Sequence, residues 1–210
     1  MKKRIAKDLL DIQAVFLKPQ DPFTWASGIK SPIYCDNRLT LSYPKVREDV
    51  ENALAEIIRK EYPSCNMVMG TSTAGIAHAA IVATILGLPM GYVRTSSKDH
   101  GRQNQIEGKL IDNAKIVVIE DLISTAGSAV EVVEVLRKEG AEVLGIASIF
   151  TYGMRKATER LAEHNVRNVS ASDYDTLLSV AVAENYIKDS DVEALLHFRN
   201  NPSDERWMLK

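Results

Sequence analysis

Residues 116–128 have the sequence IVVIEDLISTAGS, and this stretch decides the fold. Its first four residues are apolar and β-branched, two acids follow at Glu120 and Asp121, and small and hydroxyl residues occupy positions 124–128. This order is typical of a buried parallel strand with acids at its carboxyl end and an anion-binding turn at the start of a helix. Because ligands of open α/β sheets bind at that edge, we expect the substrate site here.

The turn at residues 124–128 has the composition of a phosphate loop. Small residues let the backbone approach a ligand closely, and N–H groups at a helix start bind anions, with Thr125 and Ser128 as further donors. Taken alone, the turn is equally well explained as an ordinary helix N-cap. The acids before it favour phosphate, because carboxylates beside a phosphate site suit a sugar phosphate bound with a divalent metal. The alternative for Glu120 and Asp121 is a solvated strand end. Neither a Walker A motif nor a GxGxxG motif after a strand is present.

The composition indicates an ordinary globular protein without a nucleic-acid or membrane partner. The chain has 210 residues, 45% of them hydrophobic and 26% charged, and a net charge of −2. This balance predicts no basic surface for nucleic acid, and no run approaches the roughly 20 apolar residues of a membrane span. Cys35 and Cys65 fit neither a disulfide framework nor a metal knuckle, so we expect reduced thiols in a cytoplasmic protein.

Strand and helix patterns alternate from about residue 65 to 170, which predicts a parallel sheet with right-handed crossovers. Before them, apolar residues at helical spacing predict a single helix over 3–17, and the prolines and aromatics of 18–38 predict a loop and hairpin. Two closing helices are expected after residue 170. The predicted strands are 65–70, 88–93, 115–119, 141–150 and 166–169, and the predicted helices around them are 44–60, 76–86, 129–138 and one before residue 166.

The polar segment 94–108 concentrates positive charge and has almost nothing to bury. It contains Arg94, Lys98, His100 and Arg102. Its composition alone favours a solvated loop without a function. The functional alternative is a loop that closes over an anionic intermediate and excludes water. His100 is better explained as a hydrogen-bond donor than as a metal ligand, because no second His or Cys lies nearby in the sequence.

The segment at 116–128 resembles, over its full length, the signature that binds phosphoribosyl diphosphate (PRPP) in the type I phosphoribosyltransferases. Four other segments carry the resemblance, and it is strongest to the members of the family that use orotate. They are FTWASGIKSPIYCDNR (23–38), GTSTAGI (70–76), YVRTSSKDHG (92–101) and SIFTYG (148–153). The first is the most discriminating, because the N-terminal hood differs among members that use different bases.

The resemblance implies a single α/β domain over residues 1–210 with the type I phosphoribosyltransferase fold. In this fold a parallel sheet flanked by helices forms a core, here about 44–170. A small hood covers it, built from about residues 1–40 with C-terminal contributions. The resemblance further implies a homodimer in which the segment 94–108 reaches the site of the partner subunit.

The implied reaction is transfer of a 5-phosphoribosyl group from PRPP to orotate, giving orotidine 5′-monophosphate (OMP) and pyrophosphate in pyrimidine biosynthesis. Mg²⁺ is the implied cofactor, held through PRPP and water near Glu120 and Asp121 and not by direct protein ligands. One alternative is a purine phosphoribosyltransferase. The segment 23–38 distinguishes the two possibilities, and here it favours orotate. Another is a PRPP-sensing regulator that binds nucleic acid, which would need a basic face or an added domain.

The resemblance also assigns roles to individual residues. The catalytic residues are Lys98, which stabilises the leaving group, together with Glu120 and Asp121, which face the ribose. Orotate would contact Lys30, Tyr34 and Ser124, and the loop 70–73 would touch pyrophosphate. The implied PRPP-binding residues are Lys30, Thr71, Arg94, Lys98, His100, Glu120, Asp121, Leu122, Ile123, Ser124, Thr125, Ala126, Gly127 and Ser128.

Three positions depart from the pattern of some family members. Thr95 and Ala74 stand where those members have lysines, and Tyr152 lies where others place an arginine for the carboxylate of orotate. These departures affect the expected orotate contacts and leave the PRPP segment intact. Arg155, slightly further on, is a weaker candidate for that carboxylate and is better explained as a surface residue at a helix start.

Overall fold

The structure is a computed structural model that describes residues 1–25, 28–94 and 105–209. Its central sheet has the strand order β10-β9-β8-β5-β6-β7. All neighbouring strands are parallel except β6 and β7, which pair antiparallel. The predicted parallel sheet is therefore confirmed. The strands are β5 (Met67–Thr71), β6 (Met90–Val93), β7 (Ile106–Glu107), β8 (Lys115–Ile123), β9 (Glu142–Thr151) and β10 (Asn168–Asp173).

Helices cover both faces of this sheet, as the apolar run in β8 requires. Val117 and Ile119 pack into the core on the side of α1, α2, α3 and α6, whereas Ile116 and Val118 pack against α4. Alternate residues of a strand point to opposite faces, so a strand buried on both sides must be apolar at every position. The helices that flank the sheet are α2 (Pro44–Glu61), α3 (Ala74–Leu86), α4 (Gly127–Lys138) and α5 (Arg155–Glu163).

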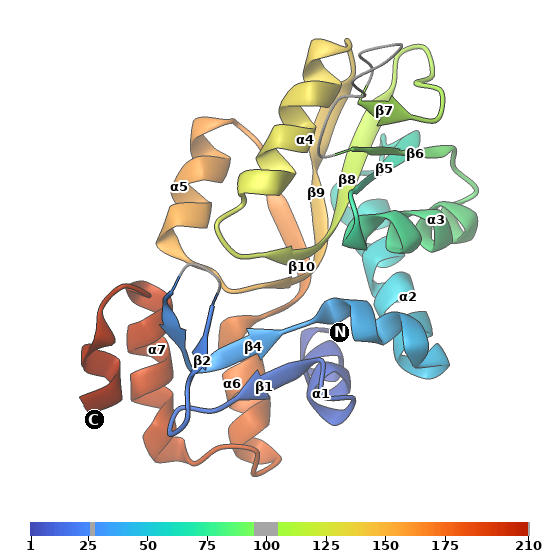
Figure 1. Ribbon diagram of the computed structural model, residues 1–210. Helices are drawn as coiled ribbons and strands as arrows, with labels where there is room; N and C mark the ends of the chain where they lie inside the picture. Colours follow the sequence, from blue (N-terminus) through green and yellow to red (C-terminus); the bar gives the residue numbers. More distant parts are fainter. Residues whose placement is uncertain (26–27, 95–104, 210) are drawn as a thin grey trace.

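The N-terminal segment and the C-terminal helices lie together at one end of the sheet (Figure 1). Here β1 pairs with β4, β2 pairs with β3, and α1 packs against α6 and β10. We call this assembly the hood. Its elements are α1 (Lys2–Asp11), β1 (Val15–Leu17), β2 (Phe23–Thr24), β3 (Lys30–Ser31), β4 (Ile33–Cys35), α6 (Tyr174–Ala183), η2 (Asp189–Asp191), α7 (Val192–Asn200) and η3 (Glu205–Leu209); η1 (Asn37–Ser42) leads from it to α2.

Several element boundaries differ from the sequence prediction: β10 occupies Asn168–Asp173 in place of 166–169, α3 begins at Ala74 in place of residue 76, and β7 has no predicted counterpart. Three further differences concern the hood and the site. The helix expected over 3–17 ends at Asp11, because Gln13 has a positive φ of 58° and the chain turns there into β1. The strand expected to end at residue 119 continues to Ile123, because the long β9 offers pairing partners up to Thr151. The following helix begins at Gly127 and not at Ala129.

Among the described residues, no helix combines the length and the apolarity that crossing a membrane requires.

Gly75 brings α3 unusually close to the sheet. A Cβ at this position would lie 2.4 Å from the backbone oxygen of Ile119 and 2.5 Å from Oγ1 of Thr71. The obstructing oxygen of Ile119 belongs to the central strand and cannot move aside cheaply. Gly75 therefore sets the distance between the start of α3 and the carboxyl end of β8.

We expect Gly75→Ala to lower the free energy of unfolding by roughly 3 kcal/mol, the upper end of the cost of overpacking. Urea unfolding measures this change. Gly87→Ala is the matched control, because Gly87 has a positive φ of 67° but no atom within 4 Å of its added Cβ. The control should lose only about 1 kcal/mol from backbone strain. Equal losses in the two variants would contradict the close-approach argument.

Candidate active site

The carboxyl ends of β5 and β8 meet at Glu120. The Oγ1 of Thr71 donates a hydrogen bond to Oε1 of Glu120 at 2.8 Å, and the N–H of Asp121 donates to the same oxygen at 3.1 Å. The Oγ of Ser128, on the first turn of α4, donates to Oε2 at 3.4 Å. Glu120 thus joins the end of β5 to the start of α4, and only 5% of its surface is exposed.

Burial and the neighbouring Asp121 carboxylate raise the pKa of Glu120 to about 8. Desolvation disfavours the charged carboxylate, and a second negative charge nearby adds to the effect. Asp121 itself is half-buried. The two acids that the sequence presents as a pair therefore have different environments, one inside the protein and one at its edge.

The hood is attached to this strand end through Asn37. The Nδ2 of Asn37 donates to the backbone oxygen of Asp121 at 2.7 Å, and Sγ of Cys35 donates to Oδ1 of Asn37 at 3.2 Å. Asn37 is fully buried. Burial raises the pKa of the Cys35 thiol well above its usual range, with the charges of Asp121 and Asp36 adding to the effect. Nothing in the sequence marks Asn37 as part of the site, because its partner is 84 residues away.

The phosphate loop keeps its backbone donors unused. Ala126, the N-cap of α4, has a left-handed conformation with φ of 61°, and its oxygen accepts the N–H of Val130 at 3.1 Å. The N–H groups of Ala126, Gly127 and Ser128 have no acceptor among the residues that the structure describes. Unpaired N–H groups at a helix start form an anion site, so this geometry fits the expected phosphate.

The loop after β5 and the residue after β6 form a second side of the site. Ser72 donates through Oγ to the oxygen of Val93 at 2.6 Å, and the Ser72–Thr73 peptide bond is cis. Arg94 follows β6, and its Nη1 lies 3.5 Å from Oε1 of Glu107. Thr71 and Arg94, two of the expected PRPP-binding residues, therefore lie at the same sheet edge as Glu120. Lys98 and His100, and with them Thr95 and Arg102, lie outside the described residues.

The expected base-binding residues lie on the hood and beside β9. Tyr34 on β4 is 42% exposed, and its ring lies 5.7 Å from that of Phe23. The Nζ of Lys30 donates to Oγ1 of Thr24 at 2.7 Å across the hairpin. Tyr152, at the position of the missing arginine, is buried and stacks on Trp25 with ring centroids 6.0 Å apart.

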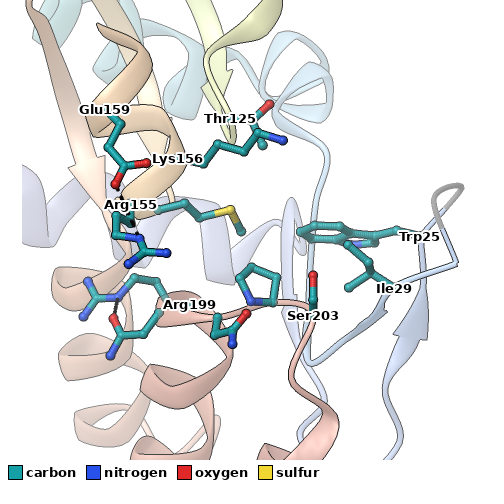
Figure 2. Close-up of a pocket in the computed structure, with 12 residues that line it drawn as sticks. Trp25, Ile29, Thr125, Arg155, Lys156, Glu159, Arg199 and Ser203 are labelled. Carbon is teal, nitrogen blue, oxygen red and sulfur yellow. Dashed lines mark hydrogen bonds and ion pairs between the residues drawn. The ribbon is translucent and has the colours of Figure 1, made fainter. Parts of the chain in front are cut away.

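A cavity of about 440 Å³ lies beside the phosphate loop (Figure 2). The hood, the loop, α5 and the end of α7 all contribute to its wall. Arg155 points along this wall toward Glu159 at 3.6 Å, and its side chain is 82% exposed, as expected for a surface arginine. The residues that line the cavity are Trp25, Ile29, Thr125, Met154, Arg155, Lys156, Glu159, Arg199, Asn200, Asn201, Pro202 and Ser203.

Comparison with known proteins identifies this arrangement. Residues 41–181 match the family model described as a phosphoribosyl transferase domain. Orotate phosphoribosyltransferase from Bacillus cytotoxicus is 56% identical over 208 residues, which is 99% of this chain and 99% of that protein. The chain belongs to the orotate phosphoribosyltransferase family. The fold and family expected from the sequence are thereby confirmed.

Other members of the family agree. Orotate phosphoribosyltransferase from Listeria monocytogenes is 54% identical over 99% of this chain and 98% of that protein. The crystal structure of orotate phosphoribosyltransferase from Aeropyrum pernix superposes with a TM-score of 0.74 at 32% identity, over 83% of this chain and 96% of that chain. An adenine phosphoribosyl transferase from Trypanosoma brucei, at 16% identity and a TM-score of 0.61, shares the fold alone.

The raised pKa of Glu120 predicts a pH-dependent stability. The folded state favours the protonated carboxyl, so this stabilisation is complete below the ordinary pKa of 4.5 and is lost as the pH rises through about 8. We expect Glu120→Gln, which cannot ionise, to become more stable relative to the unaltered chain across this window. The difference can grow by up to about 1.4 kcal/mol per pH unit.

Urea unfolding at several pH values across this window measures the difference. Glu131→Gln, the same substitution at an exposed position of α4, is measured in parallel as the matched control. A difference for Glu120→Gln that stays constant with pH would show that the carboxyl titrates normally.

Proposed function

We propose that the chain catalyses the reaction after which its relatives are named, transfer of the 5-phosphoribosyl group of PRPP to orotate with release of OMP and pyrophosphate. The observation that carries the proposal is the sheet edge at Glu120 and Asp121, followed by a loop with free N–H groups. Full-length similarity to orotate phosphoribosyltransferases supports orotate as the acceptor. The product places the reaction in pyrimidine biosynthesis.

PRPP would lie along the carboxyl edge of the sheet. The loop at 124–128 binds its 5-phosphate through N–H and hydroxyl donors, with Leu122 and Ile123 leading into it. Asp121 faces the ribose hydroxyls. Glu120 holds the end of β5 and the start of α4 at a fixed separation and adds negative charge close to the ribose when ionised. The pyrophosphate lies toward Thr71 and Arg94.

The acceptor would enter from the hood, with Ser124, Tyr34 and Lys30 as its contacts. Support comes from the hydrogen bond of Asn37 to Asp121, which ties the hood to the ribose side of the site. Burial raises the pKa of Tyr152 well above its usual range, and the nearby Tyr34 and Asp121 add to the effect, which supports a location of Tyr34 on this side of the site.

The chemistry needs positioning and fixed charge more than it needs a nucleophile of the protein. Positive charge develops at the anomeric carbon as pyrophosphate leaves, and the carboxylate of Asp121 stabilises it, joined by that of Glu120 when Glu120 is ionised. Orotate attacks with its own deprotonated ring nitrogen, so no general base is required. Lys98, with Arg94 and His100, stabilises the charge on the departing pyrophosphate.

Mg²⁺ is the cofactor that we propose, carried by PRPP. The strand end fits this role, because the half-buried carboxylate of Asp121 is a hard oxygen acceptor for the waters that Mg²⁺ retains. The described residues contain no group of three or more potential ligands that could hold a metal by themselves. When bound, the ion neutralises charge on the pyrophosphate.

A homodimer is supported by the outer face of α3. This helix contains no Asp, Glu, Lys or Arg, its His78 is buried, and its apolar residues lie on all sides. Such a helix is normally covered. The neighbouring η1 contains Leu39, which is 38% exposed, and Tyr43 directly after η1 is 45% exposed. A second copy of the chain would cover this face. The dimer that we propose is one in which the segment 94–108 of each subunit reaches the site of its partner.

The cytoplasm is the compartment that we propose. Cys35 and Cys65 are both free thiols, as expected in a reducing environment.

Purified protein should form OMP from PRPP and orotate only in the presence of Mg²⁺. Parallel reactions with adenine, guanine and hypoxanthine should yield no nucleotide, because the hood is specific for orotate. Absorbance of orotate and chromatography of products measure both outcomes. Consumption of PRPP with a purine but never with orotate would overturn the assignment of the acceptor.

Mixing two inactive variants tests whether sites are shared between subunits. Asp121→Asn removes the ribose contact, and Lys98→Ala removes the loop cation. Each homodimer should be inactive, whereas a mixture should regain up to about a quarter of the activity through sites that combine two intact halves. Self-association, measured by sedimentation, is the control. Dimers that exchange subunits but regain no activity would show that each chain completes its own site.

A further inference from the structure

Arg160, on the last turns of α5, lies against the outer side of the phosphate loop. Its Nη1 donates a hydrogen bond to the backbone oxygen of Thr125 at 3.0 Å. The same Nη1 would lie 2.9 Å from a Cβ added to Gly127. The guanidinium therefore fills the space that the missing side chain of Gly127 leaves, and it touches the loop at the backbone oxygen of Thr125.

This contact sets the direction of one loop donor. A trans peptide unit is planar and carries its C=O and N–H on opposite sides. Holding the oxygen of Thr125 against Arg160 therefore points the N–H of Ala126 away from α5, into the anion site. Ala126 has a left-handed φ of 61°, which L-residues adopt at a cost, so the loop gains from an external contact that stabilises this conformation.

Arg160 also brings a positive charge that is not neutralised locally. Among the residues that the structure describes, no carboxylate lies within ion-pair distance of its guanidinium. The side chain is half-buried, so solvent screens its charge less than that of an exposed arginine. A dianionic phosphate in the loop would lie one peptide unit away from this cation.

We propose that Arg160 is a positioning residue for the 5-phosphate of PRPP, acting through the carbonyl of Thr125 and through its uncompensated charge. The inference rests on the proposed function for the identity of the substrate. It assigns to α5 a role in substrate binding that its sequence, RKATERLAE, does not suggest. Arg160 does not touch the reacting atoms, so its effect falls on affinity for the phosphorylated substrate.

Arg160→Gln is the variant that tests this role, and Arg137→Gln is its matched control. Arg137 joins α4 to the end of α5 by donating to the backbone oxygens of His164 and Asn165, at 2.7 and 3.1 Å, away from the phosphate loop. Both variants remove an arginine–carbonyl contact between the same regions. Only Arg160→Gln removes one at the loop.

Two measurements are made on each full-length variant. Calorimetric titration with ribose 5-phosphate reports binding of the phosphate without the reaction, and steady-state kinetics report KM for PRPP, KM for orotate and kcat. We expect Arg160→Gln to weaken ribose 5-phosphate binding and raise KM for PRPP about tenfold, with KM for orotate and kcat changed less than about twofold. Arg137→Gln should leave all four values unchanged, and Arg160→Lys should recover most of the affinity.

Unchanged ribose 5-phosphate affinity in Arg160→Gln would overturn the proposal, as would equal losses in the two Gln variants. If Arg160→Gln does not fold, Gly127→Ala replaces it, because its methyl group would displace the guanidinium; an unaltered affinity then overturns the proposal. A chain that binds ribose 5-phosphate in an Arg160-dependent way, but forms no OMP, would refute the proposed function and retain this inference.

Discussion

Glu120 lies at the carboxyl end of the central strand with its carboxyl group inside the protein, where hydroxyl groups of Thr71 and Ser128 donate to it. Burying an ionisable group is costly unless it is hydrogen-bonded or loses its charge, and here both conditions are met in part. The benefit is geometric. The Glu120 side chain connects the end of β5 to the first turn of α4. It therefore fixes the distance between the segment that would bind the pyrophosphate of PRPP and the segment that would bind its 5-phosphate.

The remaining contacts extend outward from this strand end. The close approach at Gly75 brings α3 onto β8 from one face, while α4 covers the other. Asn37 ties the hood to the backbone of Asp121, and Arg160 holds the outer side of the phosphate loop. Asn37 and Arg160 each donate to a backbone oxygen, and the missing side chain of Gly75 leaves room for the backbone oxygen of Ile119. The site is therefore shaped mainly by the main chain, and the side chains keep it in place.

The sequence predicts the sheet because its determinants are local. An apolar run at 116–119 followed by acids and small residues is typical of a strand buried on both faces that ends at the ligand edge. The end of β8 is not predictable in this way, because Leu122 and Ile123 remain in the strand through pairing with a distant β9. Likewise Asn37 and Arg160 contact backbone atoms 84 and 35 residues away, and a backbone acceptor leaves no signal in the sequence. The position of residues 120–128 at the ligand edge of the sheet can be predicted from the sequence. The contacts that Asn37 and Arg160 make with this segment cannot.

The stack of Trp25 on Tyr152 has a consequence for how the molecule can be observed. The chain has two tryptophans, and Phe198 lies against both, with ring centroids 5.7 Å from Trp25 and 5.7 Å from Trp207. All indole emission therefore originates in one aromatic cluster, and Trp25 also lines the cavity beside the phosphate loop (Figure 2). Trp207 is buried, so any ligand that reaches the cavity alters chiefly the light from Trp25. The protein carries its own optical probe at the junction of hood and sheet, without any label being introduced.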